Sequence, residues 1–259
     1  MIPFVDIHCH LLPGLDDGPQ LLEESLEMCR IALADGIQTI IATPHINEQW
    51  PDVTVSRIDA AVRRLRAALV ENGLSLNLHS AAEVMVSDDL IQRWQDHELP
   101  GMGTGNRYLL IELSGVVFDG LEFLARELID AGTRPILAHP ERYTALLQTP
   151  ERIDLLIRAG FLMQLNARTL TEPRSPALQK VVRGWLRHGQ IHLVATDAHS
   201  PRHRVPRMSG AYARIVEWCD VMVADRLCSI NGLAILQGLP IVTTQPKPHR
   251  PAWRSLLGF

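Results

Sequence analysis

No stretch of this chain approaches the run of about 18 apolar residues that a membrane-spanning helix needs. The first residues also lack the basic and then apolar pattern of a secretory signal. A strongly basic balance is absent too, since the formal net charge of the 259 residues is −4, which argues against a general nucleic-acid-binding protein. These absences predict a cytoplasmic protein with no membrane span and no nucleic-acid partner.

Cysteine is scarce, and the four thiols form no CxxC pair, which predicts reduced cysteines in a cytoplasm rather than a disulfide framework. The residues six positions after Cys9, Cys29, Cys219 and Cys228 are Leu15, Asp35, Asp225 and Ala234. None of them is the arginine with which a cysteine-based tyrosine phosphatase cradles phosphate around its thiolate. The sequence therefore excludes that chemistry.

Short apolar runs alternate with amphipathic stretches along the chain. The runs that predict strands are 4–8, 38–43, 75–80, 108–113, 135–138, 161–165 and 191–195. The stretches that predict helices are 20–35, 54–72, 87–97, 119–131, 151–159, 176–188 and 208–219. This alternation is typical of a parallel sheet, open or closed, and the chain length suits a single α/β barrel.

No shift of composition marks a domain boundary within residues 1–243, which we expect to form one domain closed by one or two helices over 221–239. Residues 244–259 are Pro-rich and basic and predict an extended tail. The stretch 56–69 is amphipathic and Arg-rich. It is either an outer barrel helix with a solvated face or a contact in a homo-oligomer.

Residues of the metal-ligand types stand at or just after the ends of most predicted strands. They are His8, His10, His45, Glu83, Glu112, His139, Asp197 and His199. The carboxyl ends of the strands in a parallel barrel meet at one face, so we expect these side chains in one pocket. Residues i and i+2 of a strand point the same way, which lets His8 and His10 face one ion. Because the donors outnumber what one ion needs, two or three Mn, Fe or Zn ions are predicted.

The segments "DIHCHLLPGLDDG", "ATPHI", "AAEV", "IEL", "AHPER" and "ATDAH" resemble, in this order, the PHP (polymerase and histidinol phosphatase) superfamily. The nearest branch contains the CpsB/YwqE-like metal-dependent protein-tyrosine phosphatases of bacterial capsule and exopolysaccharide loci. The resemblance runs from residue 5 to about residue 207. It implies a single-domain α/β fold, a distorted seven-stranded (β/α)7 barrel of the PHP type. It also implies a centre of three divalent metal ions, Mn²⁺ foremost, with Fe or Zn as alternatives.

The resemblance further implies how the ligands divide among the ions. His8 and His10 would share one metal with Glu83 and Asp197; Glu83 would bridge to a second metal held by Glu112 and His139; Asp17, His45 and His199 would hold the third. Two adjacent acids occur in "DDG", and we favour Asp17 over Asp16 as the ligand.

Two arginines and one tryptophan complete the expected site. Arg142 of "HPER" matches a phosphate-contacting arginine of the family, and Arg204 stands where a second such arginine is expected. Arg202 and Arg207 are the alternatives to Arg204. Trp50 is either a flap that stacks on the substrate ring or an anchor for its loop.

The resemblance implies a protein-tyrosine phosphatase that hydrolyses phosphotyrosine in proteins. A bacterial tyrosine kinase of capsule or exopolysaccharide biosynthesis is the expected substrate and partner. The alternative within the superfamily is a small-molecule phosphoesterase of the histidinol-phosphate or nucleotide type. A binding module without turnover is disfavoured, because every ligand position is filled. The expected chemistry is in-line attack by a metal-activated hydroxide, with arginines neutralising the phosphate oxygens.

Overall fold

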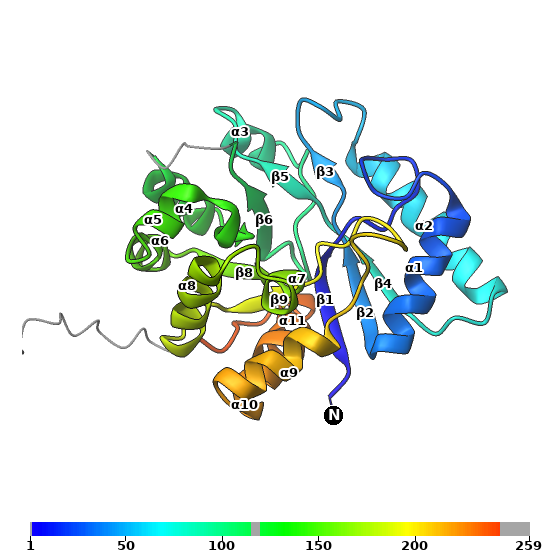
Figure 1. Ribbon diagram of the computed structural model, residues 1–259. Coiled ribbons are helices and arrows are strands. Elements are labelled where there is room, and N and C mark those ends of the chain that lie inside the picture. The colour runs from blue at the N-terminus through cyan, green and yellow to red at the C-terminus, as the bar shows by residue number, and fades with distance from the viewer. Residues whose placement is uncertain (1, 115–119, 244–259) are drawn as a thin grey trace, which may run out of the picture.

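The computed structural model describes residues 2–114 and 120–243, which form one α/β unit with two parallel sheets (Figure 1). The first sheet has the order β1-β2-β4, with β1 (Phe4–Cys9), β2 (Ile37–Ala42) and β4 (Asn77–Ser80). The second has the order β3-β5-β6-β7-β8-β9, with β3 (His45–Ile46), β5 (Glu83–Met85), β6 (Tyr108–Glu112), β7 (Arg134–Ala138), β8 (Leu162–Asn166) and β9 (Leu193–Ala195). The expectation of an α/β fold with parallel strands is thus confirmed.

Each of the seven predicted runs contains a strand, but a barrel of seven strands is not confirmed, because the described ranges hold nine. The run that starts at β2 breaks at Thr43 and Pro44 before β3. Pro44 has no N–H to donate to a ladder, which explains the interruption. A second break, at Ala81 and Ala82, separates β4 from β5. A parallel bridge between Cys9 and Ala198 links β1 to the segment after β9 and so joins the two sheets.

Helices cover the outer faces of the sheets. The α-helices are α1 (Leu22–Asp35), α2 (Val55–Glu71), α3 (Leu90–Gln95), α4 (Leu121–Asp130), α5 (Thr144–Gln148), α6 (Arg152–Ala159), α7 (Ala167–Thr171), α8 (Pro176–Arg187), α9 (Ser209–Trp218), α10 (Val221–Asp225) and α11 (Asn231–Leu236). A 3₁₀ turn, η1 (Pro140–Arg142), follows β7, and a π-helical turn, η2 (Arg226–Ile230), lies between α10 and α11. Figure 1 shows α1 and α2 flanking β2 and β4, with α4 and α8 on the side of β6 to β8.

Local sequence explains why these helices form and which face they bury. In α8 the Ser175 hydroxyl accepts a hydrogen bond from the Leu178 N–H, and Pro176 occupies the first turn, where its missing N–H costs nothing. The same helix buries Trp185 and Leu186 against the core. The Arg-rich stretch 56–69 lies in α2, which buries one apolar side and leaves most of its arginines outward. The homo-oligomer contact proposed for this stretch stays a prediction.

The end of the fold opposite the strand carboxyl ends is closed by α11. Gly232 of this helix packs on β1, where an added Cβ would lie 2.8 Å from the Val5 side chain. Only glycine permits this close approach. The helices expected over 221–239 are therefore present, and the tail over 244–259 lies outside the described residues. Among the described residues, no helix combines the length and apolar character needed to cross a bilayer.

Candidate metal centre

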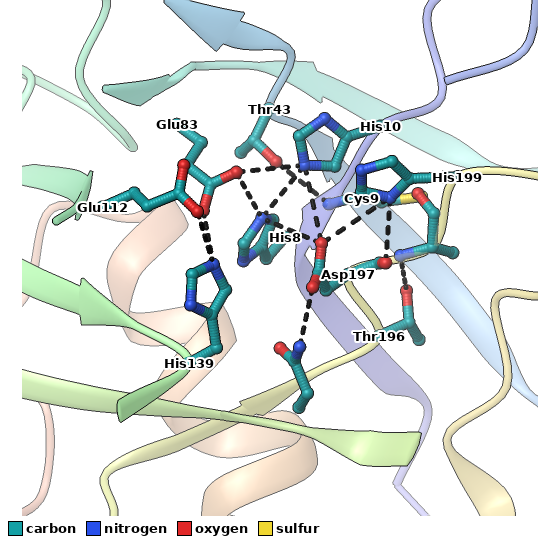
Figure 2. A network of polar contacts seen from close by, with 12 residues as sticks. His8, Cys9, His10, Thr43, Glu83, Glu112, His139, Thr196, Asp197 and His199 are labelled. Atoms are coloured by element: carbon teal, nitrogen blue, oxygen red, sulfur yellow. Dashed lines mark hydrogen bonds and ion pairs between the residues drawn. The ribbon is translucent and has the colours of Figure 1, made fainter. Parts of the chain in front are cut away.

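Seven of the nine predicted ligands lie at the carboxyl ends of strands or in the loops beyond them, and His45 and Glu83 begin the short strands β3 and β5, which follow β2 and β4. Figure 2 shows seven of the nine ligands converging: His8, His10, Glu83, Glu112, His139, Asp197 and His199. We call these nine residues the ligand cluster: His8, His10, Asp17, His45, Glu83, Glu112, His139, Asp197 and His199. The cluster spans nearly two hundred positions of sequence, yet its side chains converge because parallel strands end at one face. Except for Asp17, these side chains are buried or mostly buried.

Glu83 stands at the middle of the cluster. Its Oε2 atom lies 3.2 Å from the Nε2 atoms of His8 and His10 and 3.2 Å from Nδ1 of His45. Its Oε1 atom lies 2.9 Å from Nε2 of His139. One carboxylate therefore touches four imidazoles that come from three separate segments, because His8 and His10 both lie at the end of β1.

Glu112 and Asp197 flank this carboxylate on two sides. The Oε1 atom of Glu112 is 3.4 Å from Nε2 of His139. The Oδ1 atom of Asp197 is 3.5 Å from Nε2 of His8 and 3.6 Å from Nε2 of His10. The two Nε2 atoms of His8 and His10 face each other at 3.2 Å. Carboxylate and imidazole atoms thus point at shared points in space rather than pairing one to one.

The two adjacent acids of "DDG" have different surroundings. Asp16 is buried, and its Oδ2 atom accepts from His10 Nδ1 at 2.7 Å and from the His45 N–H at 3.0 Å. Asp17 is about half exposed, and its Oδ1 atom lies 3.3 Å from Nε2 of His199 and 3.6 Å from Nε2 of His45. Asp16 therefore orients His10 through its second ring nitrogen, while Asp17 faces the cluster, which supports the preference for Asp17.

The residues of the cluster fit divalent metal ions. Three groups bring candidate ligand atoms within 4.8 Å of one another: His10, Asp17, His45 and His199; His8, His10 and Asp197; and His45, Glu83 and Glu112. Within the described ranges, the buried atoms Glu83 Oε2, Asp197 Oδ1 and His45 Nδ1 have no hydrogen-bond partner. Buried polar atoms without partners are costly. Coordination by these nitrogen and oxygen donors, without thiolate, is typical of Mn, Fe or Zn.

The grouping by distance differs in part from the division implied by the family resemblance. His10 and His45 each belong to two of the three distance groups. His139 belongs to none of them but contacts both Glu83 and Glu112. The cluster is therefore one continuous set of donor atoms, in which a single residue can contribute to two neighbouring metal positions.

Charges within the cluster shift the pKa values strongly in the metal-free protein. Burial opposes protonation of His10, but the carboxylates of Asp16 and Glu83 outweigh it and raise the pKa of His10 to about 10. Burial likewise opposes ionisation of Glu83, yet contacts with His8, His10 and His139 hold its pKa well below its usual range. Burial and the nearby charge of Glu83 raise the pKa of Glu112 to about 7. Carboxylates this close together repel one another, and bound cations would offset that repulsion.

Two members of the cluster have strained backbones. His139 has φ of 34° and Asp197 has φ of 51°, in the left-handed region that non-glycine residues rarely adopt. Such strain costs on the order of 1–3 kcal/mol at each residue and concentrates at functional sites. The strain turns each side chain inward just after its strand ends.

Of the predicted phosphate-binding arginines, Arg142 and Arg204 both reach the cluster. Arg142 donates a hydrogen bond to Oδ2 of Asp197, and Arg204 forms an ion pair with the same oxygen at 2.5 Å. Their side chains are 35% and 30% exposed, so both guanidiniums remain accessible to a ligand. Arg202 and Arg207, the alternatives, are both exposed, and among the described residues neither side chain forms an ion pair with the cluster. 

Trp50, predicted as a flap or a loop anchor, is half-buried and packs against the hydrophobic core. This position agrees with an anchor, while its role toward a substrate stays a prediction.

Sequence reasoning missed a pair of amides on β8 that support two of the ligands. The Oε1 atom of Gln164 lies 2.8 Å from Nδ1 of His8. Its Nε2 atom donates to Oδ1 of Asn166, and the Asn166 amide donates to Oδ2 of Asp197 at 2.7 Å. The signal was two buried amides in the apolar run "FLMQLN", which is unusual for a core strand.

Comparison with known proteins agrees with this geometry. The family model for capsular polysaccharide synthesis proteins CpsB/CapC matches residues 4–237. The tyrosine-protein phosphatase YwqE of Bacillus subtilis (strain 168) is 30% identical over 260 residues, covering 98% of this chain and 99% of YwqE. The tyrosine-protein phosphatase CpsB of Streptococcus pneumoniae is 28% identical over 238 residues, covering 90% of this chain and 98% of CpsB.

Solved structures agree as well. A structure from work on YwqE of Bacillus subtilis and CpsB of Streptococcus pneumoniae, described as metal-dependent tyrosine phosphatases, superposes with a TM-score of 0.88 at 28% identity. That match covers 94% of this chain and 98% of the other. A dihydropyrimidinase from Brevibacillus agri shares only the fold, with a TM-score of 0.51 at 11% identity over 95% of this chain and 74% of the other.

Proposed function

Because the chain belongs to the CpsB/CapC family of capsular polysaccharide synthesis proteins, we propose that it is a metal-dependent protein-tyrosine phosphatase that hydrolyses phosphotyrosine in proteins. The single observation that carries the proposal is the buried cluster of imidazoles and carboxylates with two accessible arginines beside it. The relatives named as tyrosine-protein phosphatases match nearly the whole chain, which supports the same activity here.

We propose three divalent ions in the ligand cluster, Mn²⁺ foremost and Fe or Zn as alternatives. The assignment is His8, His10, Glu83 and Asp197 to the first ion; Glu83, Glu112 and His139 to the second; and Asp17, His45 and His199 to the third. The three groups of converging donor atoms support this number. Divalent ions bound there would lower the pKa of water and offset the charge of a phosphate group.

The residues of the chain itself would bind and orient the phosphate. Arg142 and Arg204 are held in place by Asp197 before substrate arrives, so little ordering cost remains when they receive phosphate oxygens. Guanidinium groups can bind phosphate with two parallel hydrogen bonds, which fixes its orientation. A phenolic leaving group has a pKa of about 10, so it departs with less help from a proton donor than an alkoxide needs.

Several finer features belong to the same proposal. The substrate is a bacterial tyrosine kinase of capsule or exopolysaccharide biosynthesis; membership in a capsular polysaccharide synthesis family supports the pathway. We propose that the protein acts in the cytoplasm. The four free cysteines are consistent with such a reducing compartment. The strands of the seven predicted runs, with the short strands β3 and β5 following two of them, are interpreted as the distorted (β/α)7 barrel of the PHP type.

The test is a comparison of substrates with the metal-reconstituted protein. Protein treated with EDTA should lose turnover and regain it with Mn²⁺. A phosphotyrosine peptide should then be hydrolysed in preference to histidinol phosphate and nucleotide monophosphates, measured as kcat/KM. A preference of about tenfold for histidinol phosphate or a nucleotide would replace the proposal by the small-molecule phosphoesterase.

A further inference from the structure

A cavity of about 510 Å³ opens beside the ligand cluster. Its lining includes Arg142, Asp197 and Arg204, and continues along α7 to Arg174 and the start of α8. Its volume falls within the range of about 300–1,000 Å³ typical of ligand pockets, which is more than a phosphate group alone requires. The cavity therefore has room for the tyrosyl ring and for neighbouring parts of a peptide.

The wall of this cavity offers both apolar and charged surface. Leu178 and Val205 line it and are half-buried, so they provide apolar contact area for a ring. The remaining charged residues on α7 and just beyond it are Arg168, Glu172 and Arg174. A substrate seated here would therefore meet fixed charges beyond its phosphate.

Four arginines line the cavity, and Arg174 is the one that forms no ion pair among the described residues. Asp197 forms ion pairs with both Arg142 and Arg204. Arg168 pairs with Glu172 at 2.8 Å, with both side chains more than half exposed. Arg174 is exposed, and within the described ranges no carboxylate lies within ion-pair distance of it. The pocket is proposed to bind the phosphate group of the substrate. An unpaired cation on its wall favours a second anionic group on the same ligand.

The neighbouring cavity is a weaker candidate for the same peptide. It measures about 590 Å³ and shares Arg168 and Glu172 with the first, but neither Arg142 nor Arg204 lines it. Neither of its acids is free, because Asp35 accepts hydrogen bonds from the backbone and hydroxyl of Ser209 at the start of α9, and Glu172 pairs with Arg168. Of these two cavities, only the first is lined by both phosphate-binding arginines and by an arginine without an ion pair among the described residues.

We propose that Arg174, with Arg168 beside it, forms a subsite that binds a carboxylate side chain next to the phosphotyrosine. The substrate class is therefore an acidic phosphotyrosine peptide, and this inference rests on the proposed function. Arg174 determines specificity and takes no part in the chemical step. The ion pair between Arg174 and the peptide carboxylate would be exposed to water. The preference for acidic peptides is therefore modest, roughly two- to fivefold in kcat/KM, and weakens as the salt concentration increases.

The experiment uses the full chain loaded with Mn²⁺ and three phosphotyrosine peptides of one length. They carry Glu, Gln or Lys on both sides of the phosphotyrosine, and the measured quantity is the ratio of their kcat/KM values within each enzyme. The unaltered protein should prefer the Glu peptide over the Gln peptide roughly two- to fivefold at low salt. Arg174→Gln should bring this ratio close to one, and Arg174→Glu should favour the Lys peptide.

The matched control is Arg64→Gln, which removes the same charge from an exposed position of α2 far along the chain from the cavity lining. Its ratio should equal that of the unaltered protein. Equal rates for the Glu and Gln peptides, or a preference that survives Arg174→Gln, would overturn the subsite and leave the phosphatase activity standing. Failure of the Mn²⁺-loaded protein to hydrolyse any of the peptides would overturn the proposed function, and the subsite with it.

Discussion

Glu83→Gln is the most demanding test of the ligand cluster, because one nearly isosteric change alters contacts with four imidazoles. The substitution keeps the side-chain volume but replaces a carboxylate oxygen with an NH₂ group that cannot bind a cation. At the positions of Oε1 and Oε2, the lost contacts are the three at 3.2 Å and the one at 2.9 Å. We expect fewer bound Mn²⁺ ions per chain and a near-complete loss of turnover.

The effect on the metal-free protein can be estimated from burial. Glu83 and His10 are both almost completely buried, so water does not screen their attraction. Removing one partner of such a pair costs about 3–5 kcal/mol when the remaining charge is left buried and alone. Asp16 still faces His10 at 2.7 Å, so we expect the lower end of this range, about 3 kcal/mol. At roughly 2–4 °C per kcal/mol for a domain of this size, the midpoint Tm should fall by roughly 6–12 °C.

The pH dependence of this loss has a definite sign. The pKa of His10 is raised to about 10 in the folded protein from an ordinary value of 6.5. Stability from the charged imidazole is therefore fully present below pH 6.5 and is lost as the pH rises through 10. The difference in unfolding free energy between the two proteins should be largest near pH 6 and should shrink toward pH 10.

The assay combines metal analysis, turnover and thermal unfolding in EDTA over this pH range. Glu122→Gln, an exposed glutamate on α4, is the matched control and should change none of these quantities. If Glu83→Gln bound as many Mn²⁺ ions as the unaltered protein and turned over at a similar rate, Glu83 would not be at the centre of the site. The reasoning about the cluster would then be wrong.

Three further predictions follow from the geometry. Arg142→Ala should raise KM and lower kcat for a phosphotyrosine peptide while metal content holds; loss of metal would instead make Arg142 a support of Asp197. Asp17→Asn should reduce the number of bound Mn²⁺ ions, whereas Asp16→Asn should mainly weaken their affinity about 10–100-fold, as calorimetric titration would show. His192 is buried, which lowers its pKa to about 3, so its neutral form stabilises the fold above pH 6.5 and this stability is lost as the pH falls toward 3. Denaturant unfolding at pH 5 and 7 should show a smaller pH effect in His192→Gln than in the unaltered protein, and equal effects would contradict this assignment.

The convergence of the ligands could be predicted from sequence because it depends on topology more than on detail. Once the runs before His8, His139 and Asp197 are interpreted as parallel strands, their ends must share one face. All seven predicted runs contain strands, for the same reason: apolar periodicity is a local property. The two short strands β3 and β5, which lie beyond the predicted runs and bring the described strands to nine, depend on backbone hydrogen bonds around Pro44 and Ala81, which periodicity does not report.

Local sequence could not explain the difference between Asp16 and Asp17, which have the same side chain at adjacent positions. Their roles differ because the loop after β1 turns one carboxylate toward Nδ1 of His10 and leaves the other facing His199. The support that Gln164 gives to His8 was also hidden, since the partners lie 156 positions apart.

The sequence by itself determined the α/β class, the order of the elements and the set of donor atoms, because these follow from local periodicity and residue chemistry. Only the tertiary structure decided which carboxylate orients a histidine, which amides support the ligands and which arginine of the cavity is left without a partner. The physical reason is that hydrogen bonds and ion pairs depend on distances of a few ångströms between segments far apart in the chain. Those distances are fixed only when the strands pack into sheets and the loops close over their ends.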